Sequence, residues 1–382
     1  MAACMKRKTA GFFICLISVF LLSTADSEAK EFYRIGQDYR AMAMGNTGIT
    51  TANNSSALFY NPAAMSNIFS WWVDFPGMQF YYSDNWADAY DRYQNGIQLE
   101  TQSEIFSFME DFLGDNYYLR VDAAINAFFN MDKKGFTIGA NYTYEYILDF
   151  SIRNAAAPEV DYLSRLDLIK QAGFSYPIGL GQFVIGITFK QIDRNELLGL
   201  YTYNDALNET EFPDFTTVFS GGGDSGSGTG YDIGFVYRTS TAAHITYGAV
   251  WRSEVLLGDA TKIPSQVDLG ISLRQESLMF RWILAMDIKD VLFALEPEGD
   301  ETSRSYMRRL HYGTEIGIFP IDKTSSFLSI RAGYNQGYLT YGAEMTIYHY
   351  MNIGYTKYTE EIGEYSGQRG SDRTVWYLSF AF

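Results

Sequence analysis

Apolar and polar residues alternate with a period of two along most of the chain after residue 70. In 117–130, Leu119, Val121 and Phe129 share one face, whereas Arg120 and Asp122 share the other. This is the period of a β-strand, in which successive side chains point to opposite sides. Fourteen segments show it: 76–83, 117–130, 136–147, 165–176, 183–190, 231–238, 243–252, 267–274, 280–289, 309–319, 327–335, 338–347, 350–358 and 373–382. We therefore predict an all-β, antiparallel fold of about 14 strands for residues 71–382.

Three features of these segments favour a transmembrane β-barrel over a soluble β-sandwich. Many of the segments run for about ten residues, which matches a tilted bilayer crossing, whereas soluble strands average five or six. One face is rich in Leu, Ile, Phe, Tyr and Trp, and the other carries charges that a sandwich core could not bury unpaired. The connections alternate between long and short, as expected for extracellular loops and periplasmic turns. The long ones fall near 84–116, 149–161, 196–229, 255–263, 293–307 and 359–372.

Local sequence sets further expectations for this barrel. Apolar residues at helical spacing in 86–113 predict that this loop is partly helical. Residues 219–230 are rich in Gly and Ser and are predicted to form a mobile extracellular tip. Pro76 lies inside the first segment, where it would interrupt the ladder. The first strand is therefore predicted to begin after Pro76 or to contain a bulge.

The first 29 residues have the form of a secretory signal peptide. A basic stretch at 6–8 precedes the short apolar run 11–22, and small residues allow cleavage after Ala29 or after Ala25. Both cysteines, Cys4 and Cys15, lie in this segment, so the mature protein is expected to have no disulfide or thiolate site.

Composition and charge exclude several classes of protein. Aromatic residues make up 17% of the chain and charged residues only 19%, below the roughly 25% usual in soluble domains. The mean hydropathy of −0.14 argues against a bundle of membrane helices. Removal of residues 1–29 would change the net charge from −16 to about −17. A chain this acidic is a poor nucleic-acid binder, because phosphate contacts need Lys and Arg.

Residues 30–70 lie between the signal peptide and the barrel, and they are rich in Gly, Ala, Asn and Met. Their centre, 40–68, contains Gly45 and Gly48 among small residues, a polar stretch at 53–56, and then Asn61, Pro62 and Ala63. With these features it resembles the N-terminal hatch of the FadL-type family of outer-membrane channels for long-chain fatty acids and other hydrophobic compounds. Asn53 and Asn54 stand where the family commonly has acidic residues, so the chain also resembles distant hatch-bearing barrels that serve in secretion or surface assembly. A purely structural alternative is that Asn61 and Pro62 cap a short helix inside the lumen.

The resemblance implies a mechanism and a set of candidate residues. Substrate would adsorb in an apolar groove between the loops at 84–116 and 196–229 and then enter the barrel. The hatch would shift, and substrate would leave through the wall or down the lumen. Candidate groove residues are Phe106, Phe108, Phe112 and Phe212. Alternatively, these aromatic rings pack the loops against one another or lie at the lipid interface.

Charges of both signs alternate onto the predicted lumen face. Most are expected to pair across the interior and to hold the hatch. Arg281, Arg309 or Arg331 could instead bind a ligand carboxylate through a bidentate contact.

Three classes of function remain. The leading hypothesis is passive uptake of long-chain fatty acids or other hydrophobic small molecules through the bacterial outer membrane. The alternative is a non-transporting barrel that anchors or escorts a surface or secreted protein. An enzyme is not expected, because no catalytic constellation, metal-ligand spacing or cofactor motif is present. The predicted partners are a hydrophobic ligand, outer-membrane lipids and, through the terminal aromatic Phe382, the outer-membrane assembly machinery.

Overall fold

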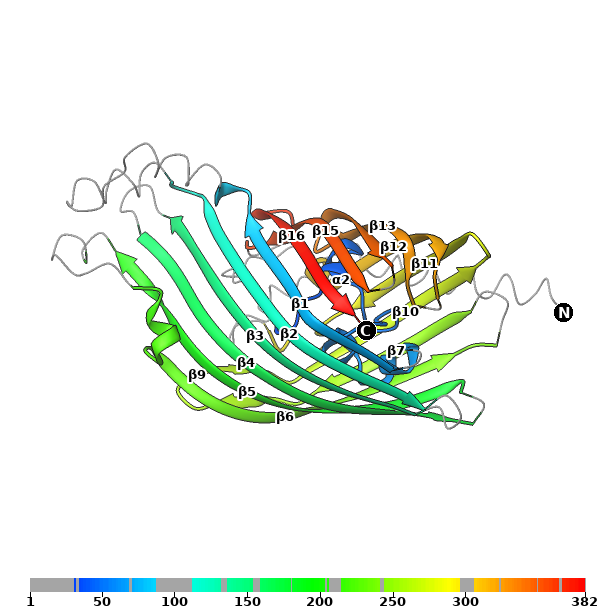
Figure 1. The fold of residues 1–382 in the computed structure, drawn as a ribbon. Helices are drawn as coiled ribbons and strands as arrows, with labels where there is room; N and C mark the ends of the chain where they lie inside the picture. Colours follow the sequence, from blue (N-terminus) through cyan, green and yellow to red (C-terminus); the bar gives the residue numbers. More distant parts are fainter. Residues whose placement is uncertain are drawn as a thin grey trace.

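The computed structural model contains a closed barrel whose strands follow one another in chain order (Figure 1). The described residues are 31, 34–68, 71–86, 112–131, 136–153, 159–179, 181–202, 205, 214–240, 244–295, 306–322, 324–348, 350–363 and 366–381. The predicted signal peptide, most of the predicted helical loop at 86–113, and Phe382 lie outside them.

Fourteen antiparallel strands form the wall, and β1 pairs with β16 to close it. They are β1 (Trp71–Ser83), β2 (Asn116–Met131), β3 (Phe136–Arg153), β4 (Glu159–Ile178), β5 (Phe183–Thr202), β6 (Asp224–Arg238), β7 (Ile245–Arg252), β10 (Gln266–Glu276), β11 (Phe280–Ile288), β12 (Leu310–Pro320), β13 (Ser326–Asn335), β14 (Tyr338–Ile347), β15 (Met351–Glu361) and β16 (Gly370–Ala381). The predicted fold class is therefore confirmed, including the number of strands.

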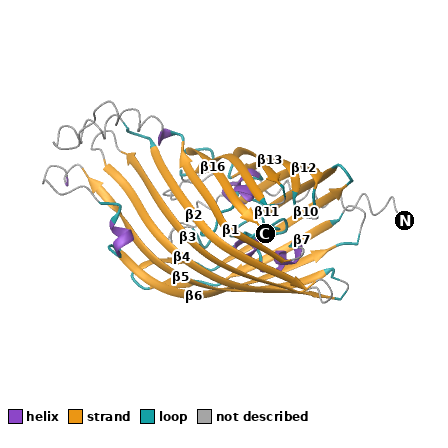
Figure 2. Cartoon of the chain, viewed as in Figure 1, coloured by secondary structure: helices purple, strands orange, loops and turns teal. Residues whose placement is uncertain are grey.

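Among the described residues the helical elements are few and short (Figure 2). The N-terminal segment holds α2 (Tyr39–Ala43), α3 (Ala57–Tyr60) and the 3₁₀ helix η1 (Pro62–Asn67), and two further 3₁₀ turns are η2 (Thr217–Ser220) and η3 (Met307–Arg309). Among the described residues, no helix is long and apolar enough to cross a membrane.

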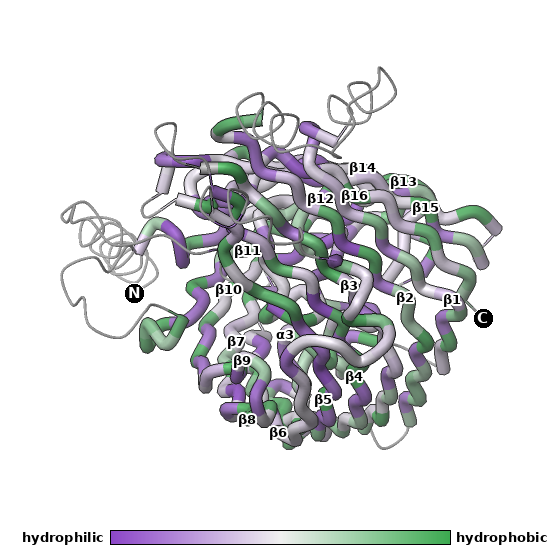
Figure 3. Tube along the Cα trace, turned by 90° about the vertical axis from the view of Figure 1, so that its left-hand side faces the viewer, coloured by the Kyte–Doolittle hydropathy of each residue, from purple (hydrophilic) through white to green (hydrophobic). Residues whose placement is uncertain are grey.

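The outer face of the barrel is apolar and the inner face is polar. Phe80, Ile138, Phe189 and Trp376 are among the large apolar side chains that point outward and are 43%, 48%, 60% and 48% exposed. Hydropathy accordingly alternates along the strands in Figure 3. A closed barrel with this surface satisfies its backbone hydrogen bonds internally and presents hydrocarbon to lipid, as an outer-membrane barrel must.

One side of the wall is much taller than the other. Strands β3, β4 and β5 have 18, 20 and 20 residues, whereas β7 and β10 to β16 have between 8 and 12. The outward residues Lys170 and Asp193 form an ion pair with an N–O distance of 3.0 Å, so the hydrocarbon region ends below them. The parts of β3–β5 that lie beyond this ion pair, on the side of the long loops, therefore stand outside the membrane and are called the upper parts of these strands (Figure 1).

The predicted loop at 196–229 extends too far at both ends, and its Gly-rich residues 224–230 form part of a strand, so the prediction of a mobile tip at 219–230 was wrong there. Strand β5 continues to Thr202 and β6 begins at Asp224, so residues 224–230 pair with 190–196. A hairpin of β8 (Val255–Leu257) and β9 (Ala260–Ile263) lies against the inner side of β6, where a loop was expected. A Cβ at Gly226 would lie 1.5 Å from the Leu257 carbonyl oxygen. The glycines therefore admit the hairpin backbone, which explains their density in a strand.

The first strand contains the predicted irregularity. Its pairing with both β2 and β16 shifts register between Asp74 and Gly77, which is a β-bulge around Pro76. The bulge alternative is confirmed, and the strand begins at Trp71 instead of after the proline.

Candidate functional site

The N-terminal segment, residues 34–68, lies inside the lumen and contacts the inner face of every strand of the barrel. Helix α2 packs on β13–β16, and η1 packs on β3–β6. The middle of the segment reaches the opposite wall, where Asp287 on β11 accepts hydrogen bonds from the backbone N–H groups of Gly48 (2.7 Å) and Ile49 (3.0 Å). The predicted placement of a short N-terminal segment in the lumen is confirmed.

Two side chains set the local conformation of this segment. The Asp38 carboxylate accepts a hydrogen bond from the Ala41 N–H (3.2 Å) and caps α2, and burial raises the pKa of this carboxyl. The Asn61 Oδ1 accepts from the Ala63 N–H (3.0 Å) and caps η1, where Pro62 occupies the first turn. Asn61 also donates from Nδ2 to the carbonyl oxygens of Ile49 (2.9 Å) and Phe235 (3.2 Å). Asn61 therefore caps a helix and also ties the segment to the wall.

Gly45 lets the N-terminal segment approach the barrel wall closely, and Gly48 lets it pack closely on itself. Gly45 has a φ of +67°, in the left-handed region that favours glycine, and its N–H donates to Thr340 Oγ1 (3.0 Å). A Cβ at Gly48 would lie 2.1 Å from the Tyr60 ring.

A belt of inward-facing strand glycines seats the N-terminal segment. At each of nine positions an added Cβ would lie less than 3 Å from an atom of that segment: Gly173, Gly186, Gly234, Gly248, Gly270, Gly313, Gly333, Gly342 and Gly354. An isolated glycine in a strand marks the close approach of another backbone, so these glycines were an overlooked sequence signal for where the N-terminal segment contacts the wall.

Gly333→Val is expected to displace the N-terminal segment, because the new Cβ would lie 2.2 Å from the Gly45 nitrogen. Residues 30–382 contain no cysteine, so Ala41→Cys supplies a single buried reporter. Maleimide labelling of this reporter should be at least tenfold faster in the Gly333→Val background. Ala332→Val, on the outward face of the same strand, is the control and should leave the rate unchanged.

Buried ion pairs connect the segment to the wall. Glu315 Oε2 accepts from Arg40 Nε of the segment (2.8 Å) and from Arg331 Nε (2.7 Å), and Arg281 Nε lies 4.0 Å from the second oxygen. On the other side of the lumen, Glu145 accepts from the Gly36 N–H at 3.0 Å. The expectation that lumen charges pair and hold this segment agrees with these contacts.

The three arginines named as carboxylate contacts all have protein partners. Arg281 donates to Thr324 O and Ser326 Oγ (both 2.9 Å), Arg309 pairs with Asp290 (3.0 Å), and Arg331 pairs with Glu315 and Glu344. All three are buried, and none lines the cavity described below. Their geometry supports the structural interpretation.

The candidate groove residues are placed only in part. Phe106, Phe108 and Phe212 lie outside the described residues. Phe112 is 1% exposed and packs edge-on against Tyr117, with ring centroids 5.6 Å apart, in a cluster that includes Trp86 and Phe150. For Phe112 the structure supports the alternative in which aromatic rings pack the loops together.

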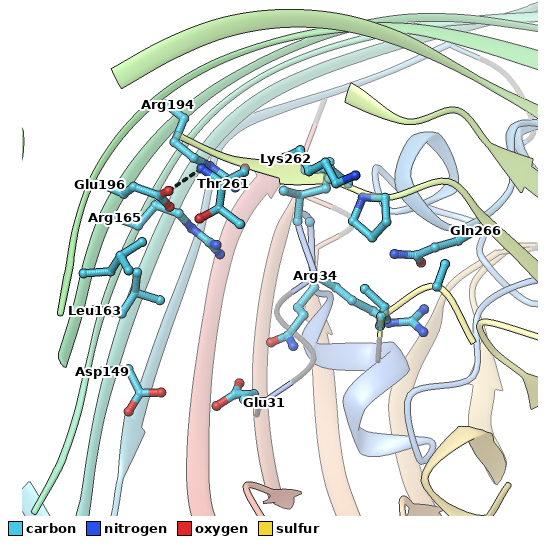
Figure 4. Close-up of a pocket in the computed structure, with 18 of the residues that line it drawn as sticks. Glu31, Arg34, Asp149, Leu163, Arg165, Arg194, Glu196, Thr261, Lys262 and Gln266 are labelled. Atoms are coloured by element: carbon cyan, nitrogen blue, oxygen red, sulfur yellow. Dashed lines mark hydrogen bonds between the residues drawn. The ribbon is translucent and has the colours of Figure 1, made fainter. Parts of the chain in front are cut away.

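Above the N-terminal segment lies a cavity of about 820 Å³ (Figure 4). The upper parts of β3–β5 contribute Asp149, Arg165 and Glu196, the N-terminal segment contributes Arg34, and the β8–β9 hairpin contributes Thr261. This volume falls within the range of small-molecule sites.

The cavity lining combines apolar surface with many charges, and several of these charges neutralise one another. Arg194 forms a bidentate pair with Asp167 (2.7 and 2.8 Å), and Lys190 Nζ lies 2.6 Å from Asp232. Sequence reasoning missed this site, because its Glu196–Thr261 contact joins positions 65 residues apart through a hairpin that was read as a loop.

His311, on the inner face of β12, contacts the backbone of the N-terminal segment. His311 Nδ1 lies 3.0 Å from the Gly45 carbonyl oxygen, and the ring is buried. Within the described part of the chain, no group of three or more His, Cys, Asp or Glu residues could hold a metal ion.

The fold and the lumen together define a bacterial outer-membrane β-barrel whose pore is occupied by its own N-terminal segment. No family model and no curated protein sequence matches the chain. Among solved structures, it is similar to a TodX deltaS2S3 mutant monoaromatic hydrocarbon channel, with a TM-score of 0.56, 12% identity, and coverage of 91% of this chain and 98% of that chain.

Two further channels show the same degree of similarity. The toluene transporter TbuX of Ralstonia pickettii matches with a TM-score of 0.56, 12% identity, and coverage of 92% of this chain and 99% of its own. The CymD monoaromatic hydrocarbon channel matches with a TM-score of 0.53, 11% identity, and coverage of 92% and 98%. At these identities the likeness shows a shared fold, and it agrees with the distant resemblance seen in residues 40–68.

Proposed function

We propose that this protein is a passive outer-membrane channel for the uptake of hydrophobic small molecules, with long-chain fatty acids as one candidate class. The observation that carries the proposal is the cavity on the side of the long loops, which the N-terminal segment closes from below. The printed descriptions of the similar structures, hydrocarbon channels and a toluene transporter, support the same class of substrate.

In this proposal a ligand enters the cavity from outside, and the N-terminal segment shifts to let it pass. The pairing of β3 with β2 and β4 runs without a register shift, so the wall at β3 is continuous. This continuity favours release down the lumen over release through β3.

Retention of ligand and loss of uptake test the proposal together. The protein is purified in mild detergent, its bound small molecules are identified by mass spectrometry, and uptake of toluene and oleate is compared in wild-type and deletion strains. A retained hydrophobic compound whose uptake slows in the deletion strain is the expected result. An empty protein and unchanged uptake of both compounds would refute the proposal.

A second candidate function is an anchor or escort for a surface or secreted protein. The continuous wall at β3 and the buried charges around the N-terminal segment favour it, since both suit a barrel that stays closed. In that case the deletion strain would keep normal uptake and lose a protein from its surface. Recognition of the C-terminal strand by the assembly machinery and binding of outer-membrane lipids are further proposals.

A further inference from the structure

Glu196 presents a buried acceptor to the cavity. Its side chain is on the inner face of β5, the residue is 1% exposed, and it lines the cavity. One carboxylate oxygen, Oε1, accepts a hydrogen bond from the Thr261 N–H of the β8–β9 hairpin. The other, Oε2, has no hydrogen-bond partner within the described part of the chain. A buried acceptor without a partner costs free energy, so a ligand that donates to it gains affinity.

The neighbouring cations already have carboxylate partners. Arg194 lies beside Glu196 in Figure 4, but its Nε and Nη2 donate to Asp167, and its Nη1 donates to the Thr261 carbonyl (2.8 Å). Arg165, the cross-strand neighbour of Glu196, has Nε 3.6 Å from Asp167 Oδ2. The Glu196 Oε2 is therefore left without a donor among the described residues, and because this oxygen is buried at the edge of the cavity, a ligand reaches it once the side chain turns toward the cavity.

The charges around Glu196 restrict the ligand to a neutral donor. Arg165 and Arg194 together balance the charges of Asp167 and Glu196, so an added ammonium would leave a net positive charge there and an added carboxylate a net negative one. A hydroxyl donates a hydrogen bond without carrying a charge. Two other residues that line the same cavity, Gln37 and Gln171, also have a buried amide oxygen without a partner among the described residues.

Apolar surface continues from Glu196 along the same strand. Leu198 and Leu200 follow it with a period of two and line the cavity, where they are 44% and 50% exposed. At about 3.3 Å per residue, Leu200 lies about 13 Å along the strand from Glu196. A hydroxyl at Glu196 would thus place an attached alkyl chain against these leucines.

We propose that the cavity binds a neutral hydroxylated amphiphile, whose hydroxyl donates to Glu196 and whose apolar part lies on Leu198 and Leu200. This inference rests on the proposed uptake function and narrows its substrate class, because it disfavours both pure hydrocarbons and ionised fatty acids.

The test compares ligands of similar length that differ in the polar group. Binding of octan-1-ol, 1-methoxyoctane and octanoate at pH 7 is measured by isothermal titration calorimetry, with the full barrel in lipid nanodiscs and empty nanodiscs as the blank. Octan-1-ol should bind roughly tenfold tighter than the ether, which lacks the donor, and also tighter than octanoate. Glu196→Gln should bring the alcohol-to-ether ratio close to one. Glu254→Gln removes the same charge from an exposed pair with Lys262 on the hairpin and should leave the ratio unchanged.

The outcomes separate the two proposals. Equal binding of alcohol and ether by the wild type, or tighter binding of octanoate, would overturn the hydroxyl assignment and leave the uptake channel standing. A tenfold preference that persists in Glu196→Gln would overturn the role of Glu196. Failure of all three ligands to bind would overturn the hydroxylated-amphiphile inference, whereas the proposed uptake function is decided by the retention and uptake experiment described above.

Discussion

Deletion of residues 34–68 is expected to raise the single-channel conductance of the purified barrel several-fold. These residues contact all fourteen strands and fill the lumen at the level of the glycine belt. The wall does not depend on them for closure, because β1 pairs with β16 over Asp74–Ser83. Planar-bilayer recordings at 1 M KCl measure the effect, and the intact protein is the reference.

The size of molecules that pass provides a second readout of this deletion. Cells that express the shortened barrel should become sensitive to large hydrophilic antibiotics that the intact protein excludes. Unchanged conductance together with unchanged sensitivity would show that the segment does not close the pore.

Glu315→Ala is expected to lower the free energy of unfolding by about 3–5 kcal/mol. The substitution leaves Arg40, Arg281 and Arg331 buried around an absent carboxylate, and among the described residues only Arg331 keeps another salt bridge, to Glu344. It also removes the ion pair that joins Arg40 of the N-terminal segment to β12. Denaturant unfolding in lipid vesicles, followed by tryptophan fluorescence, measures the loss.

An exposed pair supplies the control for this substitution. Glu276 pairs with Arg274, and its side chain is 47% exposed, so Glu276→Ala should cost no more than about 1 kcal/mol. Equal losses in the two variants would contradict the view that the buried charges hold the N-terminal segment.

The number and order of the strands could be predicted because each strand separates lipid from lumen. Residues such as Ile125 and Asn126 alternate for that reason, and alternation is readable in one sequence. Strand ends were harder to predict where a strand leaves the membrane. In β5 the residues beyond Glu196 no longer face lipid, so alternation fades although the ladder continues to Thr202.

The candidate site was predictable only where one short segment determines its own conformation. Asn61 and Pro62 form such a segment, since the cap and the first turn are local. The cavity depends on contacts across the lumen, such as Glu196 with Thr261, and on a hairpin seated on Gly226. The relevant signal was the run of glycines itself, which marks close backbone approach as readily as it marks a mobile loop.

Uptake through a barrel whose N-terminal segment is reversibly locked tests the central claim most directly. Thr340 Oγ1 on β14 lies 3.2 Å from the Ala43 carbonyl oxygen of α2, and residues 30–382 hold no native cysteine, so Ala43→Cys with Thr340→Cys can join α2 to β14 by a disulfide. Uptake of the compound identified in the purified protein is measured in cells before and after addition of a reductant, with each single variant as control. Our account predicts that the oxidised double variant takes up little compound and that reduction restores the rate. Unchanged uptake by the oxidised double variant would show that the compound crosses without movement of the N-terminal segment, and would contradict the account.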